Sequence, residues 1–300
     1  MSIRYYGASH VGLRRRDNQD SICFLENGEH ALLAVVCDGI GGGLAGDVAS
    51  RMAIEHMKES FLKMEKCSSD VQVKHWLQDT IQEANDLIFT QSTRNTEQKG
   101  MGTTLVGILK CETTTYIFNV GDSRTYGLYA DDFLALTEDH SYIADMLKRG
   151  ELSEEEAAVH PNRNMLTNAL GIWDSVRIDI NKIKNDYRAL LICSDGLHGY
   201  VSEAIIREIL ESARSVEDKV RLLIDKAFQG RGYAKAAIAA LLERLRQEYP
   251  CRRVYLSVYG DNAAAIHLYR QAGFSFNGDY DTKGERVMVL DFPETGPAET

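Results

Sequence analysis

The sequence predicts an α+β fold over residues 1–226, followed by a partial α/β unit over residues 227–292 and a tail at residues 293–300. Short apolar runs alternate with stretches in which apolar residues recur every three or four positions. The runs are typical of buried strands, and the spaced pattern is typical of amphipathic helices. After about Lys226 a glycine-rich turn opens an alanine-rich stretch, which marks the change between the two parts.

Strands are predicted in the first part at residues 31–37, 113–120 and 189–193, which are continuously apolar or rich in β-branched residues. Strands of this composition lie in sheets that are covered on both faces. Helices are predicted from apolar residues at helical spacing. The first contains Leu77, Ile81, Ala84 and Ile88 with Asp70 as a candidate N-cap, the second covers residues 205–210, and the third opens with a capping motif at residues 215–218.

The net charge of −10 falls entirely on residues 1–226, because residues 227–300 contain nine basic and nine acidic residues. An acidic surface argues against a nucleic-acid partner, since such a partner needs basic residues to neutralise its phosphates. No run of about 18 apolar residues predicts a membrane span, and residues 1–6 lack the apolar character of a signal peptide. A cytoplasmic location is therefore predicted.

The six cysteines are scattered and form no C-x-x-C pair. The sequence therefore predicts neither a zinc site nor a disulfide framework. Cys37 and Cys193 lie in apolar runs and are predicted to be buried, reduced thiols.

Three aspartates share one kind of position, where a predicted buried strand leaves the core and next to a glycine. They are Asp38, Asp122 and Asp195. If the ends of these strands converge, the carboxylates would repel one another unless a cation neutralised them. Carboxylate oxygens favour Mg²⁺ or Mn²⁺ over thiophilic metals. Asp-Gly and Gly-Asp pairs are also common in turns, which is the simpler interpretation of any one of these aspartates alone.

The order of the motifs favours the metal interpretation. Seven motifs occur at residues 15–20, 36–50, 101–104, 121–124, 136–141, 166–171 and 194–197. In sequence and order they resemble those of the type 2C (PPM) metal-dependent serine/threonine protein phosphatases. The resemblance covers residues 1–226. It implies a two-layer β-sandwich flanked by helices, and hydrolysis of phosphoserine or phosphothreonine in a phosphorylated protein substrate.

The resemblance implies a role for each residue of the site. Asp38 would bridge two metal ions, Mn²⁺ or Mg²⁺, with Asp20 supporting them and the Gly39 carbonyl as a further ligand. Asp195 would hold the second ion, and Asp122 would help to hold a third, weaker one. A metal-bound water would attack phosphorus directly.

Arg15 would clamp the substrate phosphate, because the planar guanidinium can bind two oxygens at once. One departure from the family is Gln19, which stands where many relatives carry a glutamate. A larger departure follows residues 220–226. The family pattern continues with a glycine-rich turn carrying Asp-Asn, whose aspartate is a metal ligand, and then a last strand. The sequence does not continue in this way after residue 226. Asp261 and Asn262 match the Asp-Asn pair of that turn, and we interpret the match as coincidence.

Residues 227–292 resemble the second half of a GNAT-type N-acetyltransferase. The glycine-rich turn matches its pyrophosphate-binding pattern, in which free amides at a helix N-terminus receive phosphate oxygens. The turn consists of Gln229, Gly230, Arg231, Gly232, Tyr233 and Ala234. Residues 262–274 match a later motif, which implies that Asn262 contacts acetyl-CoA and that Tyr269 protonates the departing thiolate. Packing of Tyr269 against Phe274 is the alternative.

A helix at residues 235–248, a strand at 253–258, a helix at 262–271 and a strand pair around 281–284 are predicted in this part. Both parts look incomplete, so the chain is interpreted as a fusion. Metal-dependent phosphatase activity is the leading function. The alternatives are an acetyl-CoA-dependent N-acetyltransferase and a catalytically impaired phosphatase-like module that binds metal or phosphoprotein.

Overall fold

Two antiparallel sheets form the framework of the first part. In the computed structural model, which describes residues 3–12, 17–41, 45–64, 66–229, 238, 241–246 and 252–292, the first sheet has the order β1-β2-β4-β5-β8, and β3 pairs with β2. Its strands are β1 (Asp20–Glu26), β2 (Leu32–Ile40), β3 (Gly102–Thr103), β4 (Leu105–Lys110), β5 (Thr114–Val120) and β8 (Asp179–Lys184). The second sheet has the order β7-β6-β9, with β7 (Phe133–Ala135), β6 (Arg124–Leu128) and β9 (Ala189–Cys193).

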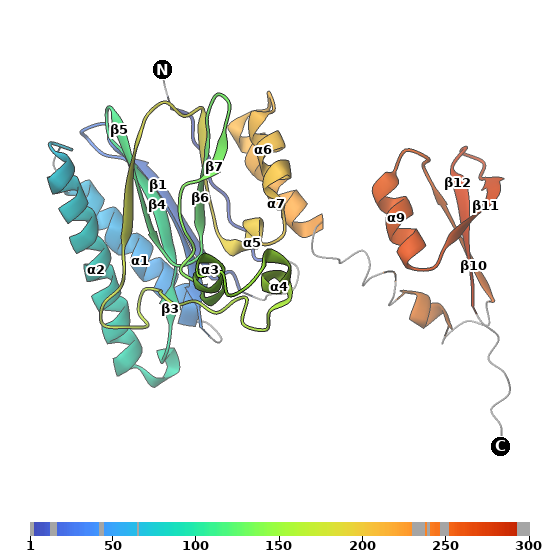
Figure 1. The fold of residues 1–300 in the computed structure, drawn as a ribbon, viewed down its shortest axis with the longest axis horizontal. Coiled ribbons are helices and arrows are strands. Elements are labelled where there is room, and N and C mark those ends of the chain that lie inside the picture. Colours follow the sequence, from blue (N-terminus) through green and yellow to red (C-terminus); the bar gives the residue numbers. More distant parts are fainter. Residues whose placement is uncertain are drawn as a thin grey trace. The chain divides into compact units, whose positions relative to one another are not determined.

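Helices cover the outer faces of both sheets (Figure 1). The helices of this part are α1 (Ala45–Leu62), α2 (Asp70–Arg94), the 3₁₀ helix η1 (Thr96–Gln98), α3 (Tyr142–Lys148), α4 (Glu154–Val159), α5 (Asp195–His198), α6 (Glu203–Glu211) and α7 (Val216–Gln229). Helices α1 and α2 share a core with the first sheet that includes Leu33, Phe61 and Leu77. Helices α6 and α7 share a second core with the second sheet, around Ile206 and Leu223. Because β9 also contacts β2 and β4, the sheets form the expected sandwich.

The predicted strands and helices of this part are confirmed; β9 has the predicted ends, and the ends of the other elements are shifted. The three strands correspond to β2, β5 and β9, and the three helices to α2, α6 and α7. The predicted N-cap of α2 is wrong by one residue, because Ser69 Oγ accepts from the Gln72 N–H at 3.3 Å. Asp70 is instead the first helical residue and forms ion pairs with Lys74 and Lys182.

One cysteine pair contradicts the sequence prediction. Cys67, before α2, forms a disulfide with Cys111, at the end of β4, and their Cα atoms lie 6.3 Å apart. The pair is separated by 44 residues, so no local spacing could reveal it. Cys37 and Cys193 are buried free thiols as predicted, and burial raises the pKa of Cys193 to about 12.

The core around α1 gives a stability prediction. Phe61 is completely buried and its ring lies 6.4 Å from that of Trp76. We expect Phe61→Ala to lower the free energy of unfolding by about 3–5 kcal/mol, because it leaves a cavity between α1 and α2. Leu62→Ala is the matched control, since the neighbouring Leu62 is 55 % exposed. Urea unfolding of both variants checks the difference, and equal losses would contradict the packing described here.

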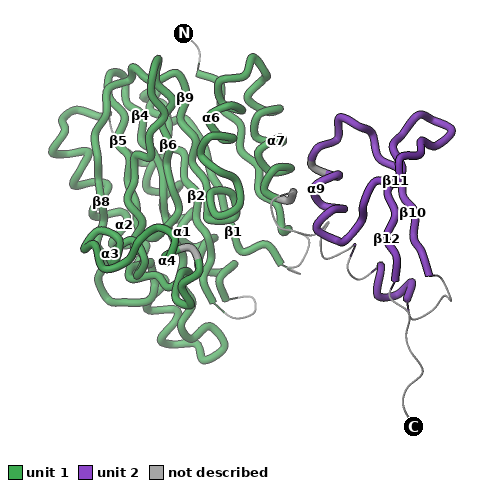
Figure 2. The backbone as a smooth tube through the Cα atoms, turned by 45° about the vertical axis from the view of Figure 1, so that its right-hand side comes forward, with its two compact units in different colours: residues 1–228 green, residues 229–300 purple. Residues whose placement is uncertain are grey.

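A second compact unit begins at Gln229, and the first ends at Phe228 (Figure 2). Its described elements are β10 (Arg253–Val258), α9 (Ala263–Gln271), β11 (Ser275–Tyr280) and β12 (Arg286–Asp291), with the antiparallel strand order β10-β12-β11. Val258, Phe274 and Met288 form its core. This confirms the predicted strand, helix and strand pair. The predicted helix at 235–248 lies largely outside the described residues, although residues 238 and 241–246 are helical, and the tail lies outside them entirely.

The β9 edge of the second sheet is open among the described strands, because β9 pairs with β6 alone. Residues 3–10 run past β1 and belong to no strand. The Tyr5 ring lies 5.4 Å from the ring of Phe24 in β1, and Phe24 itself remains 40 % exposed. The second sheet has fewer strands than the first. Near β1 of the first sheet, the side chain of Phe24 is left partly uncovered.

Candidate active site

Four aspartates of the candidate site lie on or next to β1, β2, β5 and β9. Asp20 is the first residue of β1 and pairs across the sheet with Asp38 of β2. Asp122 lies in the turn between β5 and β6, and Asp195 opens α5, with Ser194 between it and the end of β9. The strand β2 continues two residues beyond Asp38, to Ile40. Asp38 therefore lies within the strand, whereas the sequence had suggested a position after it.

These carboxylates are close enough to perturb one another. The pKa of Asp38 is raised well above its ordinary value, first by burial and then by the negative charges of Asp20, Asp195 and Asp122. A side-chain interaction with Asp195 further raises the pKa of Asp38. Burial, followed by the charges of Asp195 and Asp139, raises the pKa of Asp122 to about 7. The structure thus brings together all four aspartates singled out in the sequence.

Backbone contacts fix Asp38 in place. Its N–H donates to Thr104 Oγ1 at 2.9 Å, and its carbonyl accepts from the Thr104 N–H at 2.9 Å and from Thr103 Oγ1 at 3.0 Å. Next to it, a Cβ on Gly39 would lie 2.2 Å from the Gly46 carbonyl oxygen of α1. A side chain at residue 39 is therefore excluded, and the two threonines of motif 101–104 are supporting residues that the sequence analysis did not assign.

The chemistry of this cluster fits a divalent cation. Several carboxyl groups, two of them with raised pKa values, gather at a mostly buried position, and an ionised cluster of this kind requires positive charge to be stable. Within the described ranges, no three His, Cys, Asp or Glu side chains already have the spacing of a formed metal site. The acidic neighbours nevertheless lie close enough to Asp38 to raise its pKa, as expected of carboxylates that a cation would neutralise.

Other predicted site residues are only partly described. Arg15 and residues 230–234 lie outside the described residues, and Gln229 ends α7 without a described side chain. Asn262 is the N-cap of α9, where its Oδ1 accepts from the Ala265 N–H at 3.1 Å. The Tyr269 ring meets that of Phe274 edge-on, with centroids 6.0 Å apart, which is the packing that the sequence analysis had considered as the alternative.

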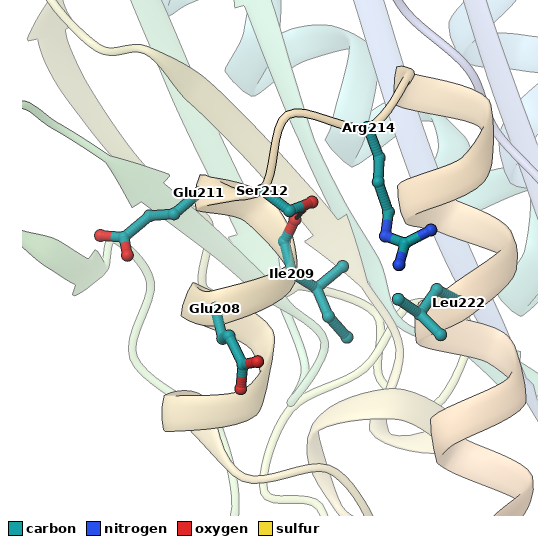
Figure 3. A pocket seen from close by; sticks show the side chains of 6 residues that line it. All are labelled: Glu208, Ile209, Glu211, Ser212, Arg214 and Leu222. Atoms are coloured by element: carbon teal, nitrogen blue, oxygen red, sulfur yellow. Dashed lines mark hydrogen bonds between the residues drawn. The ribbon is translucent and has the colours of Figure 1, made fainter.

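A pocket among the described residues lies elsewhere, between α6 and α7 (Figure 3). It is lined by Glu208, Ile209, Glu211, Ser212, Arg214 and Leu222. None of the four aspartates lines it. This hollow is therefore separate from the carboxylate cluster.

Comparison with known proteins decides the family. The family model described as protein phosphatase 2C matches residues 6–243. The chain belongs to the protein phosphatase 2C family. The serine/threonine phosphatase stp of Listeria innocua is 37 % identical over 238 residues, which is 79 % of this chain and 94 % of that relative. The match to the family model runs past Lys226, the domain boundary predicted from the sequence.

Solved structures agree with the family assignment. The crystal structure of the phosphatase Stp1 from Staphylococcus aureus has a TM-score of 0.70 at 32 % identity and covers 77 % of this chain and 94 % of that one. The catalytic domain of the phosphatase PstP, at 28 % identity and a TM-score of 0.63, was solved with 2 manganese ions; it covers 74 % of this chain and 89 % of that one.

This member of the protein phosphatase 2C family is a protein serine/threonine phosphatase that acts on phosphorylated proteins, and its family is metal-dependent. No helix in the described ranges is long and apolar enough to cross a membrane.

Proposed function

We propose that this phosphatase uses Mn²⁺ or Mg²⁺ held by Asp20, Asp38, Asp122 and Asp195, with the Gly39 carbonyl as a further ligand. The observation that carries the proposal is the gathering of acidic side chains around the partly buried Asp38, which pairs across the sheet with Asp20 and whose pKa is also raised by Asp195 and Asp122. The 2 manganese ions of the related PstP support it. Two ions, or three if Asp122 contributes a weaker site, are expected; a cytoplasmic location is part of the same proposal.

Each residue has a defined task in the hydrolysis of phosphoserine or phosphothreonine. When bound, the cations supply a water of lowered pKa and neutralise charge on the phosphoryl oxygens. Asp38 presents its carboxylate from a backbone that Thr103 and Thr104 hold on both sides. Arg15 binds the phosphate of the substrate. Asp38 and Asp122 are partly buried, which lowers the local dielectric and strengthens these charge interactions.

The decisive experiment measures phosphate release from phosphoserine and phosphothreonine peptides with and without Mn²⁺. We expect hydrolysis that requires Mn²⁺ or Mg²⁺ and is abolished by a chelator. Metal binding without turnover would favour the impaired binding module, and turnover that survives chelation would overturn the proposal.

Arg15 provides a separate prediction. Arg15→Ala should raise the KM for a phosphopeptide by about tenfold or more, because a bidentate charge-assisted contact is lost. The affinity for Mn²⁺ should stay nearly constant, since Arg15 touches the phosphate and not the metal. Steady-state kinetics and calorimetric Mn²⁺ titration check both. A collapse of Mn²⁺ affinity would assign Arg15 a structural task instead.

For the second unit we retain the weaker proposal of an acetyltransferase-like half. What supports it is the order strand, helix and strand pair in residues 253–291, with Asn262 at the start of α9. Acetyl-CoA binding should be weak and acetyl transfer negligible, because the sequence lacks the first half of such a domain. Calorimetry with acetyl-CoA and an amine acetylation assay test this. Robust acetylation would show that the unit is complete.

A further inference from the structure

Gly121, which directly precedes Asp122, has both of its backbone polar groups in hydrogen bonds. Its N–H donates to His140 Nδ1 at 3.2 Å, and its carbonyl accepts from the His140 N–H at 2.9 Å and from Asn119 Nδ2 at 3.1 Å. Its φ is +109°, and a Cβ here would lie 2.7 Å from the Thr104 side chain. The turn therefore requires glycine, and His140 holds its peptide groups from both sides.

The His140 ring is itself held in one orientation. It is completely buried. Besides Gly121, its Nδ1 faces Asn168 Nδ2 at 2.7 Å, and its Nε2 lies 3.0 Å from Asp179 Oδ2. Because two N–H groups point at Nδ1, that nitrogen must be the acceptor and Nε2 must carry the proton that goes to Asp179. Burial lowers the pKa of His140, which agrees with a neutral ring.

A second histidine holds the other side of the same turn. His198 of α5 donates from Nε2 to the Asp122 carbonyl at 3.0 Å. His198 lies three residues after Asp195 on the same short helix. The backbone of Asp122 is thus fixed between the first sheet and the helix that carries Asp195.

We propose that His140 is a positioning residue of this phosphatase, which fixes the Gly121 peptide and thereby holds the Asp122 carboxylate beside Asp195. This inference rests on the proposed function, in which Asp122 helps to hold the weaker cation. Loss of the Nδ1 acceptor leaves the buried Gly121 N–H without a partner, and the turn must shift to satisfy it. The carboxylate of Asp122 then moves with the turn.

Two nearly isosteric variants separate this role from simple packing. In His140→Asn the amide oxygen takes the place of Nδ1 and can still accept from Gly121, but the bond to Asp179 is lost. In His140→Gln the amide nitrogen takes the place of Nε2 and can still donate to Asp179, but the acceptor for Gly121 is lost. A packing role would penalise the two variants similarly.

In the experiment the purified chain of 300 residues and both variants are titrated with Mn²⁺ alone. Calorimetry measures the heat of binding, and electron paramagnetic resonance measures the concentration of free Mn²⁺. We expect His140→Gln to weaken the weakest Mn²⁺ site by about tenfold or more, as is typical when a group that supports a metal ligand is removed. His140→Asn should stay within about threefold of the unchanged chain. Equal losses in the two variants, or no loss in His140→Gln, would overturn the inference.

A measurement on the unchanged chain guards against variants that do not fold, and the variant Asp122→Asn separates failure of the inference from failure of the proposed function. Long-range ¹H–¹⁵N correlation spectra should show His140 protonated on Nε2 and bare on Nδ1; a proton on Nδ1 overturns the inference. If Asp122→Asn leaves all Mn²⁺ binding unchanged, the proposed ligand set fails, and the inference fails with it. If Asp122→Asn weakens one site but His140→Gln does not, only the inference fails.

Discussion

Replacing Asp38 with asparagine is expected to lower metal-dependent turnover by roughly two to four orders of magnitude, which corresponds to several kcal/mol of charge stabilisation. Asp38 is the residue on which the charges of Asp20, Asp122 and Asp195 converge. Asparagine keeps the shape of the side chain and removes its negative charge, so the loss reports on cation binding. The measurement is kcat on a phosphoserine peptide at saturating Mn²⁺.

The same substitution should not destabilise the metal-free protein. Burial and three acidic neighbours disfavour the ionised form of Asp38 in the folded state, so the unfolded chain accommodates that charge more easily. Asparagine removes this penalty, and the metal-free Tm should stay equal or rise. Asp131→Asn is the control, because Asp131 is an exposed aspartate outside the cluster; it should change neither quantity.

Turnover and the metal-free Tm together test the assignment of Asp38 to the metal site. Unchanged turnover in Asp38→Asn would remove Asp38 from the metal site. Lost turnover accompanied by a large drop in Tm would mean that Asp38 supports the fold instead. Lost turnover with an equal or higher Tm is the combination that a metal ligand predicts.

Local patterns predicted most elements of the fold. The apolar run of β9 and the spacing of Leu77 and Ile81 in α2 depend only on which faces are buried, and burial leaves a periodic trace in the sequence. The Cys67–Cys111 disulfide leaves no such trace, because it joins segments that are 44 residues apart in the sequence and meet only in the tertiary structure. The N-cap of α2 was missed for a different reason: Ser69 and Asp70 are both good capping residues.

The sequence predicted the residues whose own side chains carry the chemistry. It did not predict the residues that hold those side chains in place. Asp38, Asp122 and Asp195 could be singled out because each borders a glycine near the end of an apolar strand, whereas Asp20 was assigned through its motif alone. The task of Thr104 depends on a hydrogen bond to the Asp38 N–H from 66 residues away. His140 belonged to a recognised motif, but its contact with Gly121 depends on a loop that returns to the turn after β5. The only sequence signal for the role of His140 was the presence of a histidine in the motif at residues 136–141.

The open edge of β9 leads to the second large expected effect. β9 is apolar at all five positions, a composition typical of a strand with neighbours on both sides. Among the described strands it pairs with β6 alone, and an unpaired apolar edge invites pairing with other chains. We therefore expect the unchanged protein to aggregate readily. We also expect it to require a raised Mn²⁺ concentration, because the resemblance implies that the family's ending supplies a metal ligand.

Exchanging the residues after Gln229 for a type 2C ending should relieve both effects. The exchange begins there because Ala227 is buried in the core that α7 shares with the second sheet. The new ending carries a glycine turn, Asp-Asn and a final strand. Mn²⁺ for half-maximal activity should fall by about tenfold or more, because ligand charge tunes the affinity for hard cations. The soluble fraction should rise as the β9 edge is covered.

Two controls assign each effect to its cause. A glycine- and serine-rich segment of equal length removes residues 230–300 without supplying a strand, so it should improve neither property. The type 2C ending with its aspartate changed to asparagine should restore solubility but not the Mn²⁺ requirement, because it covers the edge and lacks the ligand. If the full exchange changes neither Mn²⁺ dependence nor solubility, the native residues already complete the site, and Asp261 then becomes the carboxylate to test as the missing ligand.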